Sequence, residues 1–462
     1  MLSAVCSPCS ATEAIQNTDT VATNSIMQDV SVTNGCHSLD AQMPLCGSGR
    51  TLETAGAAVL YEINSETLMY AWNPDVSMYP ASLVKIMTAL LAVENGVLTD
   101  EITVTANALS ALPANASTTD LQAGETITLE ELLYCLMVGS SNDASVVIAE
   151  YIAGSQQGFV TRMNQRAAEL GCTGTNFTNS HGLHDDAQVT TARDMAKILT
   201  EAARNELFMA FFGPTQHTVP ATNLSQERSV SSTNYMMMPE KGVYYDSRVT
   251  GGRTGITNDR ERCLAVTAES NGLRYVSIVL GAVPTFEDDN YTVKRFGNYE
   301  ETKQLLNMGF DGYSVTQILS NEQAMTQYPV TNGSNHVAAA PADIVSVVLP
   351  SGITLLDLSV RYQNVLTNLT APIKAGDTLT AVQVWYGNIC VAESPIIAMN
   401  KSDVRIATAQ NNDNETDGYT VLMTVLMIIV ALAGALYIVQ FIRKRVVRGQ
   451  HRRRRENRRR NR

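Results

Sequence analysis

The order of strand-like and helix-like segments constrains the fold of this chain most. Residues 57–63 and 67–72 alternate between apolar and polar side chains around a short turn, which predicts a hairpin. Apolar residues then recur at helical spacing in several segments between residues 130 and 203. Strand-like runs return between residues 249 and 281. Strands on both sides of a helical middle predict an antiparallel sheet covered by helices, an α+β fold.

The pattern changes from about residue 313, where short runs rich in Val, Ile and Leu are separated by turn residues. These runs predict a small β-rich, all-β domain over residues 313–400. Residues 1–50 are rich in Ser, Thr and Asn without a sustained period, so we expect this segment to be disordered. We therefore assign residues 51–312 to one larger domain and residues 401–418 to a polar linker.

A long uncharged segment lies close to the C-terminus. Residues 419–442 are 24 consecutive residues without a charge, and a helix needs about 20 apolar residues to cross a bilayer core. Three basic residues, 443–445, follow at once, and positive residues mark the cytoplasmic side of a membrane. We expect a transmembrane helix at 419–442, a basic cytoplasmic tail at 443–462, and all preceding residues outside.

The formal net charge of −12 hides an asymmetry between this tail and the rest of the chain. From Arg443 onward, 12 residues are Lys or Arg and only Glu456 is acidic. The remaining residues are therefore strongly acidic. Because they show no basic groove, the composition argues against nucleic acid as a partner of the folded part.

The first candidate for chemistry is Ser82-Leu83-Val84-Lys85, which opens an apolar helical pattern just after Pro80. Residues three apart share a helix face, so Ser82 and Lys85 should meet within one turn. A serine hydroxyl becomes a strong nucleophile when a base takes its proton, and a desolvated lysine with a lowered pKa can be that base. Backbone N–H groups at a helix start can also stabilise an oxyanion.

A second motif, Ser140-Ser141-Asn142, joins two helical patterns at residues 129–138 and 144–152. At such a junction, a Ser-x-Asn sequence can direct a hydroxyl and an amide into a shared cleft. The alternative is a plain turn with a helix cap, because Ser and Asn both cap helices well.

A third motif, Arg253-Thr254-Gly255, precedes two strand-like runs at residues 263–268 and 274–281. Asn271-Gly272 separates these runs, which is a strong hairpin signal. The motif should therefore lie on or beside an antiparallel sheet. There, a cation and a hydroxyl can bind a carboxylate, and the glycine lets a substrate backbone come close.

The three motifs, in this order, resemble those of the serine D-alanyl-D-alanine carboxypeptidases, the low-molecular-weight penicillin-binding proteins. That family has Ser-x-x-Lys, Ser-x-Asn and Lys-Thr-Gly. Arg253 is a departure, because the family has lysine there. The resemblance runs from about residue 52 to about residue 400. Further segments that resemble the family are residues 80–88, 141–144, 179–183, 191–196 and 305–310.

The resemblance implies a penicillin-binding, β-lactamase-like catalytic domain, with the active site between an antiparallel sheet and a helical part. It implies a hydrolase that removes the terminal D-alanine from peptidoglycan stem peptides through a serine acyl-enzyme, with β-lactam antibiotics as covalent inhibitors. The β-rich domain would hold the catalytic domain away from the membrane of a bacterial cell. No metal or cofactor is implied.

The resemblance also implies roles for single residues. Ser82 would be the nucleophile and Lys85 its base. Ser140 would relay a proton to the leaving amine, while Asn142 would hold the acyl side chain of the substrate.

On the leaving-group side, Arg253 and Thr254 would bind the terminal carboxylate. Gly255 would admit the substrate backbone. The backbone N–H groups of Ser82 and Ile256 would form the oxyanion hole.

Two other functions remain open from the sequence. Class A β-lactamases use a glutamate and a held water for deacylation, whereas the stretch after Asn179 offers Asp185 and Asp186 but no obvious glutamate. Alternatively, the chain is a penicillin-binding scaffold without turnover, because the Arg253 guanidinium cannot surrender a proton.

His181 and His184 lie close to these two aspartates, so a metal site is an alternative interpretation of this segment. We interpret both histidines as structural loop residues. The serine mechanism leaves no task for a metal.

Overall fold

The computed structural model describes residues 39, 52–257, 260–287, 292–363, 369–387, 389–405, 422–431 and 438. The chain divides into one unit up to Val404 and a second that begins at Arg405. Of the segment predicted to be disordered, residues 1–50, only Leu39 is described. The prediction for the rest of that segment lies outside the described residues.

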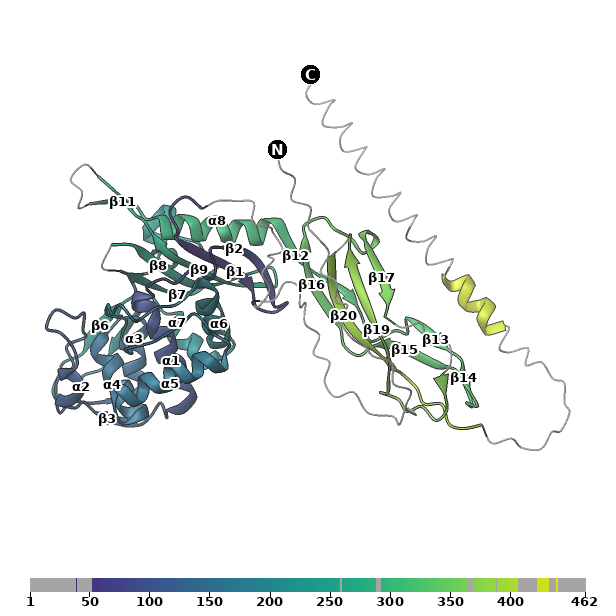
Figure 1. The fold of residues 1–462 in the computed structure, drawn as a ribbon, viewed down its shortest axis with the longest axis horizontal. Coiled ribbons are helices and arrows are strands. Elements are labelled where there is room, and N and C mark those ends of the chain that lie inside the picture. Colours follow the sequence, from purple (N-terminus) through teal and green to yellow (C-terminus); the bar gives the residue numbers. More distant parts are fainter. Residues whose placement is uncertain are drawn as a thin grey trace, which may run out of the picture. The chain divides into compact units, whose positions relative to one another are not determined.

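A five-stranded antiparallel sheet forms the centre of the larger domain, in the order β2-β1-β9-β8-β7 (Figure 1). Asn271 and Gly272 both adopt positive φ, 52° and 78°, as the tight hairpin between β8 and β9 requires. The first hairpin and the last three strands thus join into one sheet, with β7 at its edge. The strands are β1 (Ala57–Glu62), β2 (Thr67–Trp72), β7 (Val249–Ile256), β8 (Arg262–Ser270) and β9 (Leu273–Ala282).

The segment between β2 and β7 is mainly helical and covers one face of the sheet. Its helices are α1 (Val84–Asn95), α2 (Ala106–Ser110), α3 (Leu129–Met137), α4 (Asn142–Ala153), α5 (Gln156–Glu169), α6 (Ala192–Ala203) and α7 (Glu206–Phe212). Two short strand pairs, β3 (Glu101–Thr103) with β4 (Thr126–Thr128) and β5 (Gln216–Val219) with β6 (Arg228–Ser231), lie among them.

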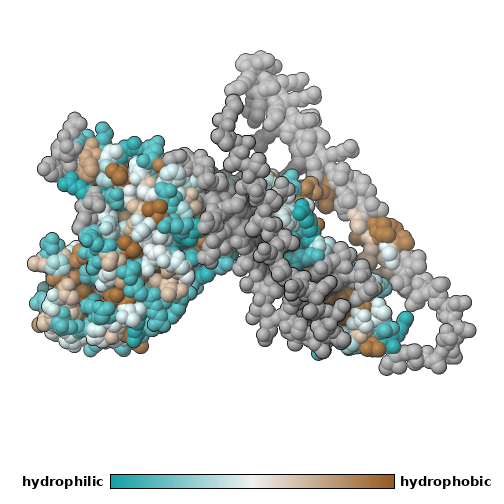
Figure 2. Space-filling model, in the orientation of Figure 1, coloured by the Kyte–Doolittle hydropathy of each residue, from teal (hydrophilic) through white to brown (hydrophobic). Residues whose placement is uncertain are grey.

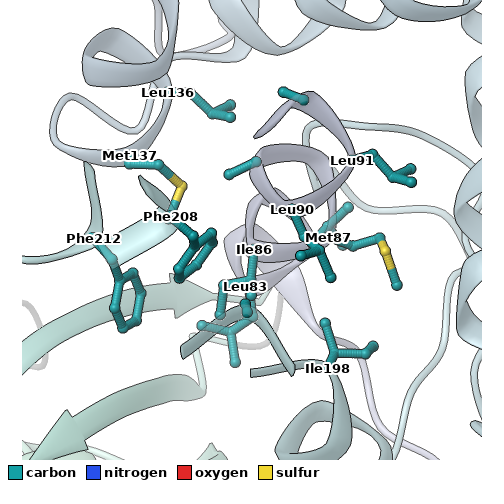
Figure 3. Close-up of a cluster of buried hydrophobic side chains, with 14 of the residues drawn as sticks. Leu83, Ile86, Met87, Leu90, Leu91, Leu136, Met137, Ile198, Phe208 and Phe212 are labelled. Carbon is teal, nitrogen blue, oxygen red and sulfur yellow. The ribbon is translucent and has the colours of Figure 1, made fainter. Parts of the chain in front are cut away.

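Helix α1 runs through the middle of this helical part and is buried from Val84 to Ala92. Apart from Lys85 and Thr88, the residues of this buried stretch are apolar, as expected for a helix enclosed by other elements. Figure 3 shows the side chains around it, which come from α3, α6 and α7. The start of α1, where the first motif lies, is therefore held firmly by the core. The buried apolar side chains labelled in Figure 3 are Leu83, Ile86, Met87, Leu90, Leu91, Leu136, Met137, Ile198, Phe208 and Phe212.

Helix α8 (Gly297–Gly312) covers the other face of the sheet (Figure 1). Leu305 and Leu306 of this helix belong to a second apolar cluster with Leu264, Val266 and Tyr275 of the sheet. Between β6 and β7 the chain makes two 3-10 turns, η2 (Tyr235–Met237) and η3 (Pro239–Tyr244). Between β9 and α8, the short strands β10 (Thr285–Phe286) and β11 (Val293–Arg295) form an antiparallel pair. The predicted α+β architecture is confirmed.

The chain continues from α8 into β12 (Tyr313–Leu319) and a β-rich part. Its main sheet has the order β13-β15-β20-β19-β17 around a core of Leu319, Val347, Val382 and Ile396. Within the described residues of this part, no α-helix occurs, so the predicted small all-β domain is confirmed. Its other elements are β13 (Thr326–Tyr328), β14 (Val330–Thr331), β15 (Val337–Pro341), β16 (Val345–Pro350), η4 (Leu355–Asp357), β17 (Leu358–Tyr362), β18 (Leu369–Thr370), β19 (Thr378–Tyr386) and β20 (Ile389–Ala398).

Residues 422–431 form a helix that carries exposed apolar side chains, coloured brown in Figure 2. Among the residues that the structure describes, no helix is both long enough and apolar enough to span a bilayer. Much of the predicted span at 419–442 lies outside those residues, so the transmembrane helix stays a prediction.

Candidate active site

The first motif begins in a 3-10 turn, η1 (Ala81–Leu83), which leads directly into α1. Ala81 has a φ of 47°, a conformation that is rare without glycine and is found at functional sites. Ser82 lies in this turn and Lys85 in the first turn of α1. Lys85 Nζ is 3.4 Å from Ser82 Oγ. The predicted encounter of the two side chains is therefore present in the fold.

Lys85 is fully buried, with 0% of its surface exposed. Its Nζ bonds to Asn142 Oδ1 at 2.7 Å and to the backbone oxygen of His181. Burial, and to a lesser degree the charge of Arg253, hold the pKa of Lys85 well below its ordinary value, while Asp143 acts in the opposite sense. A lysine in this environment can exist as the neutral amine and accept a proton.

The second motif forms the turn between α3 and α4, and its three residues have different tasks. Ser141 caps α4, because its Oγ accepts the N–H of Ala144 at 3.1 Å. Asn142 is buried at the start of α4 and faces Lys85. Ser140 has a φ of 59° and bonds through its Oγ to Arg253. The capping alternative thus applies to Ser141. The other two residues of the motif contact the basic side chains, Ser140 that of Arg253 and Asn142 that of Lys85.

Arg253 of the third motif lies in β7 and is only 3% exposed. Its Nη1 donates to the backbone oxygen of Met137 at 2.8 Å, and its Nη2 donates to Ser140 Oγ. Its Nε lies 3.4 Å from the backbone oxygen of Ser82. Burial lowers the pKa of Arg253 to about 9, which leaves it charged at neutral pH.

These contacts join all three motifs through one guanidinium. We expected the Arg253 guanidinium to be directed at a substrate carboxylate. Two of its nitrogens instead bond to a backbone oxygen and a serine within the protein. A direct contact between Arg253 and the substrate stays a prediction.

The other residues of the third motif continue β7 along the site. Thr254 is partly exposed, and its Oγ1 lies 2.5 Å from Thr233 Oγ1. A Cβ on Gly255 would lie 3.2 Å from the backbone nitrogen of Ser82, so glycine lets the strand approach the turn that carries Ser82. Ile256, at the end of β7, is 57% exposed.

Sequence reasoning gave no catalytic role to the loop at residues 179–183, yet this loop closes the site behind Lys85. His181 supplies the backbone oxygen that accepts from Lys85. Gly182 has a φ of 82°, and a Cβ there would lie 2.1 Å from the backbone oxygen of Ala81. The family resemblance of this segment was the only available signal, because a backbone carbonyl leaves no trace in the side-chain pattern.

The side chain of His181 is largely buried, and this burial, with the charge of Lys85, lowers its pKa to about 4. Its imidazole is therefore neutral at physiological pH and accepts the N–H of Leu183 through Nδ1 at 3.1 Å. His184 instead contacts Asp186 at 3.1 Å on the surface. In the described part of the chain, no cluster of three His, Cys, Asp or Glu residues could hold a metal ion.

The geometry combines a hydroxyl, a buried lysine of lowered pKa, a second serine and an edge strand, which are the components of serine acyl transfer. The model of the family described as D-alanyl-D-alanine carboxypeptidase matches residues 49–284. A second model, described as the C-terminal domain of penicillin-binding protein 5, matches residues 313–403.

Individual relatives agree with these matches. The chain is 29% identical over 359 residues to D-alanyl-D-alanine carboxypeptidase DacF of Bacillus subtilis, covering 76% of this chain and 86% of the relative. It is 29% identical over 357 residues to D-alanyl-D-alanine carboxypeptidase DacC of Escherichia coli, covering 75% of this chain and 83% of the relative. The crystal structure of penicillin-binding protein 5 from Haemophilus influenzae superimposes with a TM-score of 0.64 at 27% identity, covering 77% of this chain and 100% of that one. The chain belongs to the family of serine-type D-alanyl-D-alanine carboxypeptidases.

Proposed function

We propose that this protein removes the terminal D-alanine from peptidoglycan stem peptides through an acyl-enzyme on Ser82. One observation carries the proposal: a fully buried lysine of lowered pKa lies 3.4 Å from the hydroxyl of Ser82. Membership of the carboxypeptidase family supports the substrate class. The mechanism needs no metal or cofactor.

In the acylation step, neutral Lys85 takes the proton of Ser82, and Ser82 Oγ attacks the carbonyl between the two D-alanines. The backbone N–H groups of Ser82 and Ile256 receive the developing oxyanion. The close approach of β7 to the nucleophile turn at Gly255 supports this arrangement, because it brings the backbone of the strand beside Ser82.

The bond to the terminal D-alanine then breaks, and its nitrogen needs a proton. Ser140 is the proposed relay for the proton taken by Lys85. Arg253 donates to Ser140 Oγ, so the hydrogen of the Ser140 hydroxyl remains available for the leaving amine. Asn142 orients Lys85 through its Oδ1 and holds the acyl side of the substrate. Water finally hydrolyses the ester on Ser82.

For the terminal carboxylate, we propose that Thr254 supplies the hydroxyl donor and Arg253 the positive charge. Thr254 is the more exposed of the two residues. A β-lactam carries a carboxylate beside a reactive amide and would acylate Ser82 in the same orientation. The observed contacts of Arg253 support a second task, since they hold Ser140 and Met137 in place.

One alternative is supported by a specific observation. Arg253 stays protonated and is bonded to backbone and serine oxygens, so it cannot serve as a proton shuttle. If the family lysine were needed for that purpose, the protein would bind penicillin without turnover. Measuring release of D-alanine from a D-Ala-D-Ala peptide separates the two functions: we expect release, and labelling by penicillin without release would support the scaffold. A β-lactamase would instead hydrolyse the penicillin in repeated turnovers.

We further propose that the protein is anchored once in the membrane of a bacterial cell by residues 419–442. The uncharged length of the segment and the basic residues after it support this topology. The catalytic part would lie outside and residues 443–462 inside. A protease added to intact cells should then cut the linker at 401–418 and spare the tail. Digestion of a tail epitope from outside would contradict the orientation.

A further inference from the structure

We propose that Tyr299 is a positioning residue for carboxylate recognition and that it acts through Thr233 on Thr254. The inference rests on the proposed function of Thr254 but concerns residues to which neither the motifs nor the comparisons assign a task. Tyr299 lies in the first turn of α8, on the face of the sheet opposite the helical part. Its hydroxyl reaches the active-site edge of β7 through two successive hydrogen bonds.

The first bond runs from Tyr299 OH to the backbone oxygen of Thr233, at 2.8 Å. The second joins Thr233 Oγ1 to Thr254 Oγ1, at 2.5 Å. Thr233 itself is exposed, whereas Tyr299 is only 4% exposed. A buried phenol thus fixes the backbone of an exposed residue, and the side chain of that residue contacts the third motif.

Tyr299 is itself held rigidly by neighbouring rings. Its ring centroid lies 5.4 Å from that of Tyr235, 5.3 Å from that of Tyr244 and 5.8 Å from that of Phe296. Aromatic pairs at these distances attract one another beyond their burial. Burial also raises the pKa of Tyr299 above its ordinary value, so the phenol remains a donor at every working pH.

The segment that follows Thr233 is fastened to the same strand. Asn234 is fully buried, and its Oδ1 accepts the N–H of Met236 at 3.1 Å. A Cβ on Gly252 of β7 would lie 2.1 Å from Asn234 Nδ2, so the two chains are in direct contact. The position of Thr233 beside β7 is therefore set from two sides, by Tyr299 and by Asn234.

The pair of hydroxyls suits a carboxylate. In a bond between two hydroxyls, one donates and the other accepts, so the acceptor keeps its own hydrogen for a ligand. A carboxylate offers two oxygens and accepts such bonds strongly. The direction of the free O–H depends on where Thr233 holds Thr254. A shift of the Thr233 backbone would weaken carboxylate binding without disturbing Ser82 or Lys85.

The test compares acylation by a penicillin with acylation by its methyl ester, which lacks the carboxylate charge. Tyr299→Phe keeps the ring and removes the hydroxyl. We expect its second-order acylation rate to fall about three- to tenfold with the penicillin, the effect of one neutral hydrogen bond, and to change less than twofold with the ester. Thr233→Val should give the same pattern, and Thr233→Ser should restore the rate. The double variant Tyr299→Phe/Thr233→Val should be acylated no more slowly than the slower of the two single variants.

Tyr244→Phe is the matched control, because it removes a hydroxyl from the same aromatic cluster. The hydroxyl of Tyr244 accepts the N–H of Phe296 and does not contact Thr233. The control variant should leave both rates unchanged. An equal loss with acid and ester in Tyr299→Phe, or no loss with either, would overturn the inference. Acylation is measured without peptide turnover, so a failure to release D-alanine would refute the proposed hydrolysis while leaving this result readable.

Discussion

The start of α1 and the edge strand β7 form two sides of the same site, but they relate to the sequence differently. At the helix start, Ser82 and Lys85 are three residues apart, and helix geometry alone brings them together. On the strand, Arg253 bonds to the backbone of Met137, 116 positions earlier in the chain. The first arrangement is local and could be predicted from spacing, whereas the second depends on how the helical part meets the sheet.

Each side contributes one buried basic side chain, and burial affects the two differently. Burial holds the pKa of Lys85 well below its ordinary value, which favours the neutral amine that the proposed mechanism needs as a base. Burial of the guanidinium lowers the pKa of Arg253 only to about 9, so it remains a charge at neutral pH. The fixed charge of Arg253 lowers the pKa of Lys85 further. The comparison therefore supports the proposal that the helix side transfers the proton and that the strand side supplies charge and positioning.

Ser82→Ala should have the largest effect and eliminate the chemistry of the helix side. Covalent labelling by fluorescent penicillin should disappear, because no other group in the mechanism attacks the β-lactam carbonyl. The fold should remain, since a partly exposed hydroxyl contributes only about 1 kcal/mol to stability. Thermal unfolding of the variant provides the control, and undiminished labelling would remove Ser82 from the mechanism.

Lys85→Arg should lower the acylation rate by orders of magnitude. The change keeps a positive charge but removes the base, because a guanidinium stays protonated. Rapid-quench labelling with penicillin measures the rate. A variant that acylates at nearly the wild-type rate would mean that the base lies elsewhere.

Arg253→Ala should have an intermediate effect on kcat/KM for D-Ala-D-Ala peptides. We expect a loss of about 1.5–3 kcal/mol of transition-state binding, the value of a charge-assisted hydrogen bond, and Arg253→Lys should retain much of the activity. The loss should be larger for peptides with a free terminal carboxylate than for their amides. An equal loss on both substrates would show that the role of Arg253 is purely structural.

The smallest effect concerns the pH dependence of acylation. The rate should fall as the pH decreases through the lowered pKa of Lys85, because the protonated amine cannot accept the serine proton. Removing the charge of Arg253 should raise that pKa, so the acidic limb of the Arg253→Ala profile should move to higher pH. Stopped-flow acylation from pH 5 to pH 10 measures the shift. If the acidic limbs of the wild-type and Arg253→Ala profiles superimpose, Arg253 and Lys85 are not electrostatically coupled.

Local patterns in the sequence predicted much of the fold. Asn271-Gly272 marks the hairpin β8–β9, and the apolar spacing after Ser82 marks α1. The break between α3 and α4 was visible as the Ser-x-Asn junction. In each case, neighbouring residues determine the backbone, so no knowledge of distant contacts is needed.

The contacts that complete the site could not be predicted in this way. Lys85 bonds to a backbone oxygen of His181, and Arg253 bonds to one of Met137, although neither carbonyl carries a side-chain signal. The approach of Tyr299 to Thr233 joins residues 66 positions apart. Such contacts depend on the packing of whole elements, which the sequence pattern does not specify.

The most direct test of the central claim is to identify the residue that penicillin acylates in the wild-type protein. The full-length chain is incubated with penicillin, digested, and analysed by tandem mass spectrometry. The account predicts one adduct, on Ser82, that forms faster as the pH rises through the pKa of Lys85. An adduct on Ser140 or on any other residue, or the absence of an adduct, would contradict it.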